Sequence, residues 1–353
     1  MNNEKGLAQT QPLVSVMMIA YNSACYIEDA IQGVMGQKTN FAVQLVIGDD
    51  CSTDNTQEIC ERWAAKYPGK ILLLKNEKNL GISRNYQNVW KHCTGKYIAP
   101  LDADDYWTDP DKLQKQVDFL EKHPDYAMCF HRVLCFYQES GEKRKSIPLA
   151  KETYTLEELS KMNFITHFSV VERKANCPEL PDWTMDTNCG DYAFSLIQAT
   201  KGKIRYFDKV MGVYRKHGDN AWANSHDMPK EDPVTIRERA IAYLEGQGGF
   251  PEAVESLKTA CVNGYLSWLN YAGKSDERKK TPKEAAYVDK LLQHAQIGLQ
   301  KYRQTWMEEE IYRQRMRLQA NRQGVKNLLK DMLKTSYGYV TRCIPLPKPA
   351  GAR

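Results

Sequence analysis

The chain has 353 residues, a length that favours one large domain with an appended region, or two domains. Hydrophobic residues make up 42% and charged residues 26%, which is typical of globular proteins and argues against disordered, collagen-like and membrane-embedded classes. The net charge of +5 is uneven: residues 301–353 hold twelve Lys and Arg against four acids. The rest of the chain is slightly acidic, so we expect no nucleic acid as a partner.

The cysteines and the apolar runs both indicate a cytoplasmic protein. The ten cysteines include no Cys-x-x-Cys pair, and we interpret them as buried small side chains in a reducing compartment. The longest early apolar run, residues 14–20, is too short to span a bilayer and is followed by no signal-peptide cleavage pattern.

Strands and helices are expected to alternate through the first third of the chain. Apolar, β-rich runs such as 14–20 are typical of strands that are buried on both faces of a parallel sheet. We predict strands at 13–20, 43–48, 71–74 and 97–101, with helices at 24–35, 56–66 and 82–92. This alternation predicts a doubly wound α/β sheet, mostly parallel and flanked by helices, that binds ligands beyond the carboxyl ends of its strands.

The second half of the chain is predicted with less regular elements. A helix at 112–122 and a strand at 127–137 precede a polar turn at 139–146. Residues 153–220 mix short helical and extended pieces. Residues 233–335 form a mainly helical region, with loops at 246–249 and 274–282, and we place a boundary near residue 230.

Two of the predicted strands end in carboxylates. Asp102, Asp104 and Asp105 crowd the end of one strand, where Mg²⁺ or Mn²⁺ could bridge them to a diphosphate. Asp49 and Asp50 end another, where a carboxylate could accept hydrogen bonds from a nucleobase or a ribose hydroxyl. Helix capping is the alternative for each site, but capping explains one acidic strand end better than two.

Six segments taken together resemble the family-2 glycosyltransferases with the GT-A fold. They are residues 14–22, 46–54, 79–85, 95–107, 190–192 and 214–217. The resemblance spans about 13–220 and implies a metal-dependent, inverting glycosyltransferase of the hexosyl or N-acetylhexosaminyl type. Its donor would be a nucleotide-diphospho-sugar, expected to be UDP-linked, and its acceptor a hydroxyl of a glycan, lipid-linked or cell-surface polysaccharide.

The resemblance and the boundary expected near residue 230 together predict how the chain is organised. Residues 1–12 would be an N-terminal extension and 13–230 the GT-A catalytic domain. Its donor half would run over about 13–110 and its acceptor half over about 111–230. Residues 231–353 would be a mainly helical C-terminal region with a basic tail.

By resemblance, the donor site draws on several segments. Tyr21 would stack on the base, Asp49 would accept the base N–H, and Arg84 would reach the phosphates, although Arg84 is also explained as a solvated helix residue. Asp102 would contact the ribose or the metal. The full donor-binding set is Tyr21, Asn22, Asp49, Asp50, Arg84, Asp102 and Ala103.

The implied metal, Mn²⁺ or Mg²⁺, would be coordinated by Asp104 and His217, with Asp105 as a candidate further ligand. A lone histidine such as His217 is also commonly a packed residue. The implied catalytic base is Asp191, next to Gly190, which replaces an acid that the family usually carries there.

Residues upstream of Asp191 are candidates for acceptor binding. Asp182 and Asp186 could compete for the role of base, and Trp183 could stack on a sugar. Ordinary packing explains Trp183 equally well. The acceptor-binding prediction is Trp183 and Asp182.

The C-terminal tail contains an amphipathic pattern, in which apolar residues recur at helical spacing opposite Lys326, Lys330 and Lys334. One interpretation is peripheral contact with the inner face of the cell membrane. The other is packing on the catalytic domain or on a second copy in a homo-oligomer.

Two rival functions are weighed. A sugar-nucleotide pyrophosphorylase would need a glycine-rich loop after the first strand, where this chain has Tyr21-Asn22-Ser23-Ala24. A non-catalytic sugar-binding protein on the same fold would more often lack Asp104 or Asp191.

Overall fold

The computed structural model describes residues 12–185, 187, 190–218, 232–273 and 286–302. The contacts divide the chain into two units, Met1–Leu257 and Lys258–Arg353. The boundary predicted near residue 230 lies among residues outside the described set. The helix that follows, α7 (Asp232–Gln247), belongs to the first unit.

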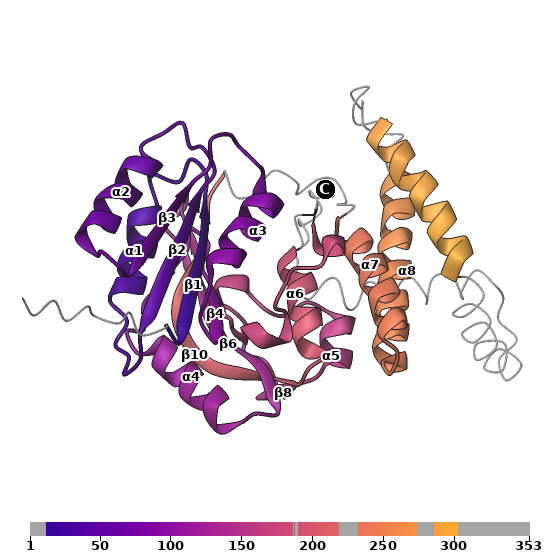
Figure 1. The fold of residues 1–353 in the computed structure, drawn as a ribbon. Coiled ribbons are helices and arrows are strands. Elements are labelled where there is room, and N and C mark those ends of the chain that lie inside the picture. Colours follow the sequence, from indigo (N-terminus) through magenta and orange to yellow (C-terminus); the bar gives the residue numbers. More distant parts are fainter. Residues whose placement is uncertain (1–11, 186, 188–189, 219–231, 274–285, 303–353) are drawn as a thin grey trace, which may run out of the picture. The chain divides into compact units, whose positions relative to one another are not determined.

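The first unit is built around a mixed sheet of ten strands (Figure 1). Eight of them form the order β3-β2-β1-β4-β9-β6-β10-β5, while β7 pairs with β6 and β8 with β10. The strands are β1 Val14–Ala20, β2 Val43–Asp49, β3 Ile71–Lys75, β4 Tyr97–Pro100, β5 Tyr106–Trp107, β6 Tyr126–Tyr137, β7 Lys143–Lys145, β8 Thr153–Tyr154, β9 Val171–Arg173 and β10 Lys203–Lys216. The first four strands in the order are parallel, as are β6 and β10, whereas β9 runs antiparallel to both β4 and β6.

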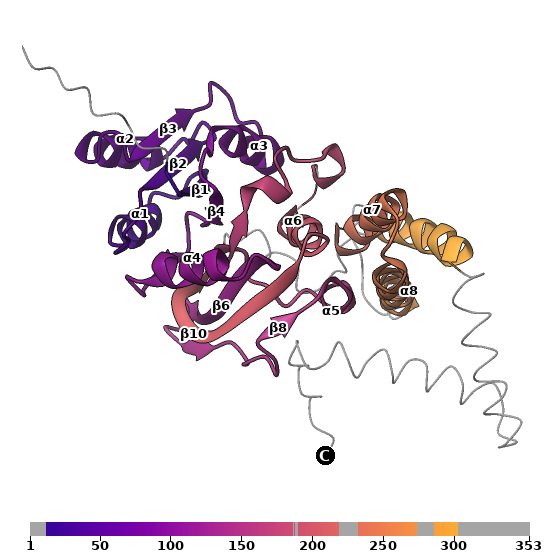
Figure 2. The same ribbon diagram turned by 60° about the horizontal axis from the view of Figure 1, so that its bottom comes forward.

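Helices cover both faces of this sheet (Figures 1 and 2). They are α1 Ile27–Met35, α2 Thr56–Lys66, α3 Ile82–His92, α4 Lys112–Lys122, α5 Leu156–Lys161, α6 Gly190–Ala199 and α7, with short 3-10 turns η1 His167–Ser169, η2 Lys174–Asn176 and η3 Asp182–Thr184. Side chains alternate along β1: Val16 and Met18 pack with α1, α2 and α4, whereas Met17 packs with α3 and α6. These two cores confirm the predicted sheet with helices on both faces.

Most predicted elements of the first unit are observed. The helices at 56–66, 82–92 and 112–122 have the predicted bounds, while α1 begins at Ile27 instead of residue 24. The predicted polar turn at 139–146 contains a short strand, β7. All three of its side chains are charged and exposed. Backbone pairing with β6 therefore stabilises this strand, and burial of side chains does not contribute.

The second unit is helical where it is described. Helix α8 (Pro251–Gly273) crosses the division between the units, and a further helix covers 286–302. Within the second unit, Tyr265 and Trp268 pack against His294. The predicted loop at 274–282 lies outside the described residues.

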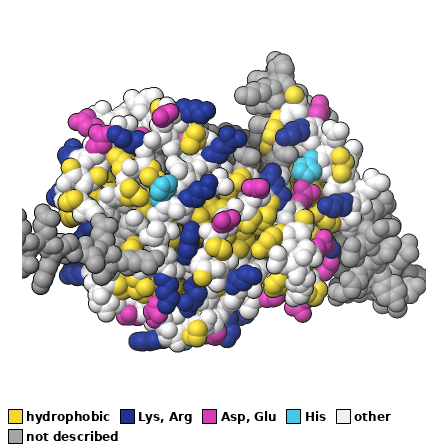
Figure 3. Space-filling model, viewed as in Figure 1, with side chains coloured by type: hydrophobic (Ala, Val, Ile, Leu, Met, Phe, Trp, Pro, Cys, Tyr) yellow, Lys and Arg dark blue, Asp and Glu magenta, His cyan; other side chains and the backbone are white. Residues whose placement is uncertain are grey.

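Two properties of the described residues bear on membrane contact. No helix among them is long and apolar enough to cross a membrane. On the face shown in Figure 3, basic and acidic side chains are mixed.

Candidate functional site

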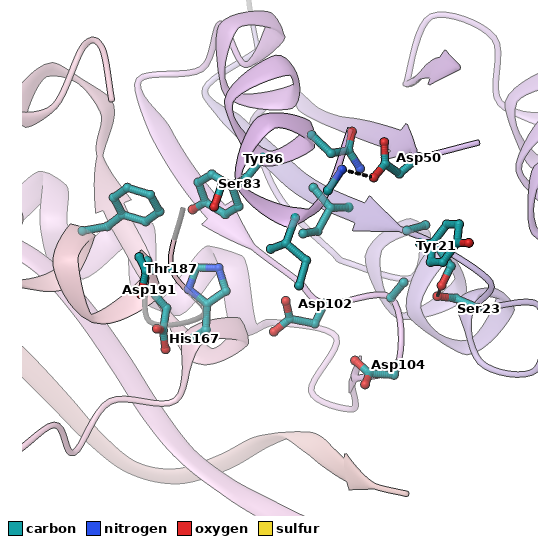
Figure 4. Close-up of a pocket in the computed structure, with 18 of the residues that line it drawn as sticks. Tyr21, Ser23, Asp50, Ser83, Tyr86, Asp102, Asp104, His167, Thr187 and Asp191 are labelled. Carbon is teal, nitrogen blue, oxygen red and sulfur yellow. Dashed lines mark hydrogen bonds between the residues drawn. The ribbon is translucent and has the colours of Figure 1, made fainter. Parts of the chain in front are cut away.

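A cavity of about 890 Å³ opens at the carboxyl ends of β1, β2 and β4 (Figure 4). The first turns of α3 and α6 also line it, through Gly81, Ile82 and Ser83 and through Gly190 and Asp191. Its volume lies within the range of small-molecule sites, and parallel strands of this kind bind ligands at this edge.

The loop after β1 forms one end of the cavity. Tyr21 is 49% exposed and lines the cavity, so its ring is accessible to a flat ligand. Asn22 has a positive φ of 50°, a conformation that Asn tolerates better than most residues. Its Oδ1 accepts the backbone N–H of Thr53 at 2.8 Å, which joins the loops that follow β1 and β2.

The two acids at the end of β2 have different environments. Asp49 is fully buried and accepts the Ser52 hydroxyl at 2.6 Å, and it is not among the described residues that line the cavity. Asp50 lines the cavity and accepts the backbone N–H groups of Leu80 and Gly81 at 2.8 and 2.9 Å. Asp50 therefore lines the cavity, whereas Asp49 stabilises the loop after β2 through its hydrogen bond with Ser52.

Arg84 lies on the first turn of α3, but its side chain is exposed and is not among the described lining residues. Neighbouring Ser83 and Asn85 line the cavity in its place. Asn85 is also an anchor, since its Nδ2 donates to the Gly48 carbonyl at 2.8 Å.

The acids after β4 divide in the same way. Asp102, Ala103 and Asp104 line the cavity. Asp105 is buried, and its Oδ1 accepts the backbone N–H of Arg215 at 2.8 Å. Asp105 therefore anchors β10, and it is not among the described residues that line the cavity.

The end of β10 brings a histidine to this acidic turn. His217 Nε2 lies 3.1 Å from Asp104 Oδ2, and its ring stacks on Tyr26 with centroids 4.5 Å apart. The Arg215 guanidinium donates to the Asp104 carbonyl at 2.9 Å and to Asp29 at 2.8 Å. Arg215 thus fixes the turn that presents the Asp104 carboxylate.

Asp104 and His217 offer an oxygen and a nitrogen donor toward one place in the cavity. No cluster of three or more His, Cys, Asp or Glu with metal-ligand geometry occurs among the described residues. Mg²⁺ and Mn²⁺ in nucleotide enzymes commonly take one or two protein ligands and complete their coordination with phosphate oxygens and water. The Asp104–His217 pair fits that pattern.

Burial raises the pKa of Asp102 to about 6, and the nearby Asp104 and Asp191 carboxylates add to the rise, while His167 opposes it. The centre of the cavity is therefore acidic, and it favours a bound cation.

Asp191 lies in the first turn of α6 and lines the cavity, beside Gly190 and Phe194. Asp182 and Trp183 are not among the described lining residues. Asp182 is exposed, while Trp183 packs on Tyr243 with ring centroids 5.2 Å apart, which favours its packing interpretation. Asp186 lies outside the described residues.

Sequence analysis did not single out two polar residues of the cavity, Tyr86 and His167. Tyr86 is in the middle of α3, and His167 is on η1, in the region where strand and helix patterns blur. Neither lies in a motif, so the sequence offers no signal for them.

Comparisons with known proteins agree with this arrangement. Residues 15–177 match the family described as Glycosyl transferase family 2. The uncharacterized protein Rv1520 of Mycobacterium tuberculosis is 29% identical over 307 residues, which are 86% of this chain and 87% of that protein. The crystal structure of TarS 1–349 from S. aureus in complex with UDP-GlcNAc has a TM-score of 0.60 at 19% identity, covering 85% of this chain and 91% of that one.

A further relative is similar enough to decide the family. TuaG of Bacillus subtilis, named a putative teichuronic acid biosynthesis glycosyltransferase, is 37% identical over 229 residues, which are 65% of this chain and 88% of TuaG. The structural match to TarS agrees on the fold. This chain belongs to glycosyltransferase family 2 and has the GT-A fold.

Proposed function

We propose that the protein transfers a sugar from a UDP-sugar to a hydroxyl acceptor with inversion at the anomeric carbon, assisted by Mn²⁺ or Mg²⁺. The observation that carries the proposal is the order of groups in one cavity: Tyr21 at one end, Asp104 beside it and Asp191 at the far end (Figure 4). His217 also lines the cavity and lies 3.1 Å from Asp104. A nucleotide base, a diphosphate and a sugar follow one another in the same order.

At the nucleotide end, Tyr21 stacks on the base and Asp50 accepts a hydrogen bond from it. Sequence analysis gave the second role to Asp49, but only Asp50 lines the cavity. Asp102 accepts a ribose hydroxyl. The UDP-GlcNAc bound by TarS supports UDP as the nucleotide.

Asp104 and His217 would hold the metal, which would supply positive charge to the leaving diphosphate. The chain's own part is to keep the two donors in place: Arg215 fixes the backbone of Asp104, and Tyr26 supports the imidazole.

Asp191 is the base. It takes the proton of the acceptor hydroxyl while that oxygen bonds to the anomeric carbon, and the bond from that carbon to the diphosphate oxygen breaks on the opposite face. UDP leaves with the electron pair, and the configuration at the carbon is inverted.

The acceptor is a glycan, a lipid-linked sugar or a cell-surface polysaccharide. TuaG, which is named for teichuronic acid biosynthesis, supports this class. An acceptor on a lipid would suit a cytoplasmic enzyme that touches the membrane through its basic tail. A homo-oligomer is the other proposed use of the tail. Family membership leaves the pyrophosphorylase alternative without support.

Calorimetry with UDP tests the metal and nucleotide sites together. Wild-type protein should bind UDP more tightly with Mn²⁺ than without it. Asp104→Ala should lose that gain and nearly all transfer, because it removes one of two protein donors. Mn²⁺-dependent UDP affinity and turnover equal to wild type in Asp104→Ala would reject the assignment.

A further inference from the structure

One wall of the cavity is not used by the reaction described above. It includes Tyr86 from α3 and His167 from η1, which Figure 4 shows near Asp102 and Asp191. Phe194 from α6 also lines this wall. If the nucleotide lies at Tyr21 and the base is Asp191, the sugar ring of the donor lies against this wall. The inference therefore rests on the proposed function.

Tyr86 is a rigid part of the wall. Its ring stacks on Phe194, with centroids 4.8 Å apart and planes 17° from parallel, and on Trp90 at 6.3 Å. The residue is 8% exposed, yet its hydroxyl has no hydrogen-bond partner among the described residues. A buried hydroxyl without a partner is unfavourable, so a ligand that supplies one gains affinity.

The Tyr86 hydroxyl is a neutral group without a hydrogen-bond partner among the described residues. Burial raises the pKa of Tyr86 well above its ordinary value of 10, and nearby carboxylates, Glu172 first among them, act in the same direction. At neutral pH the group keeps its proton, and it can both donate to and accept from a sugar hydroxyl.

His167 supplies the second polar group. Its ring centroid lies 5.9 Å from that of Tyr86, and its side chain is half-buried in the cavity wall. In Figure 4 it lies beside Asp191, on the side toward Asp102. Tyr86 and His167 therefore line the same part of the cavity, beside the ring of Phe194.

The charges of the cavity limit which sugar fits. Four carboxylates line it, those of Asp50, Asp102, Asp104 and Asp191, and the lining contains no Lys or Arg among the described residues. A sugar that carries a carboxylate would lie near Asp102 and Asp191, with no Lys or Arg side chain among the described lining residues to pair with it. Repulsion between neighbouring negative charges disfavours binding, and a carboxylate removed from water needs a positively charged or hydrogen-bonding partner.

We propose that Tyr86 and His167 form the donor-sugar subsite and select an uncharged hexose or N-acetylhexosamine over a uronic acid. Hydrogen bonds from the two side chains hold the hydroxyl or acetamido groups, and Phe194 covers an apolar face of the ring. The acidic surroundings exclude the anionic sugar.

The test is calorimetry with Mn²⁺ and four probes: UDP, UDP-glucose, UDP-GlcNAc and UDP-glucuronate. For wild type, at least one neutral donor should bind about tenfold more tightly than UDP-glucuronate. Tyr86→Phe removes one hydroxyl and should weaken the preferred neutral donor about five- to tenfold while leaving UDP unchanged. His167→Phe should do likewise, His167→Gln should restore part of the loss, and His167→Arg should improve UDP-glucuronate binding relative to wild type.

Tyr126→Phe is the matched control, because it also removes a tyrosine hydroxyl, one that contacts Thr153 Oγ1 at 2.8 Å, at a residue that is not among the described lining residues. It should bind all four probes as wild type does. The inference is overturned if wild type binds UDP but prefers UDP-glucuronate, or if Tyr86→Phe and His167→Phe both bind neutral donors unchanged. If wild type binds no UDP at all, the proposed function itself fails, and the inference fails with it.

Discussion

Asp191 is the residue on which the proposed chemistry depends most. Asp191→Asn keeps the volume but cannot take the acceptor proton, so turnover should fall by about 10²–10⁴. Binding of UDP with Mn²⁺ should barely change, because the base acts on the acceptor alone. Measuring both quantities on the same preparation separates lost chemistry from a damaged site.

Near wild-type turnover in Asp191→Asn would shift the role of base to Asp182 or Asp186. Parallel loss of UDP binding would instead make Asp191 a structural residue or a metal ligand.

Asp102 links function to stability through its pKa of about 6, which burial raises above the ordinary 3.8. The folded state holds this proton more tightly than the unfolded chain. The resulting stabilisation is complete below pH 3.8 and is lost as the pH rises past 6. Asp102→Asn has no charge to bury, so at pH 8 it should be more stable than wild type by about 1–3 kcal/mol while its UDP affinity falls.

Urea unfolding of Asp102→Asn and wild type at pH 4, 6 and 8 tests this. The difference in unfolding free energy should shrink toward pH 4. A difference that stays constant with pH would show that the Asp102 carboxylate is not held at a cost in stability.

At the scale of elements, close packing between α3 and β2 positions the nucleotide end of the cavity. Asn85 on α3 donates to the Gly48 carbonyl and accepts from Asn76, whose Nδ2 also donates to Asp50 at 2.8 Å. A Cβ at Gly48 would approach Asn85 Oδ1 to 2.5 Å. Because Gly48 has no side chain, Asn85 can approach the strand closely, and the side-chain amides of Asn85 and Asn76 then hold Asp50 in place.

Gly48→Ala should push α3 away from β2, lowering the unfolding free energy by roughly 1–3 kcal/mol and weakening UDP binding. Gly246→Ala in α7 is the control, since an added Cβ there meets nothing within 4 Å and alanine favours a helix. Urea unfolding and UDP titration of both variants decide the point. Equal stability of Gly48→Ala and wild type would contradict the packing argument.

The regular elements could be predicted from sequence because their signals are local. The helix at 82–92 has its apolar side chains at helical spacing, and β1 and β2 are mostly apolar. The carboxylates at strand ends follow from those strands. The sequence also indicated Asp104 and His217, and the structure places them 3.1 Å apart although they are far apart in the chain.

Other parts of the site depend on tertiary packing. Asp49 and Asp50 are neighbours in sequence, so only the observed orientation of their side chains tells which one meets the cavity. Tyr86 resembles any core residue of α3 until the fold shows that its hydroxyl has no partner among the described residues. His167 reaches the cavity through a single 3-10 turn, which sequence patterns do not predict.

At the scale of the whole molecule, charge separates the tail from the rest of the chain. Residues 301–353 carry a net charge of +8, although 303–353 lie outside the described residues. Deleting 322–353 should reduce binding to vesicles of anionic lipid while UDP affinity stays the same. Neutral vesicles are the control. Equal sedimentation with and without the segment would reject membrane contact, and loss of folding would support packing of the tail on the protein.

The most direct test of the central claim is a screen of nucleotide-sugar donors in which released UDP is measured with and without Mn²⁺. We expect UDP release from at least one neutral UDP-sugar. This release should depend on Mn²⁺ and should be lost in both Asp104→Ala and Asp191→Asn. The claim would be contradicted if wild-type protein released no nucleotide from any donor in the presence of metal, or if release in Asp104→Ala equalled that of wild type.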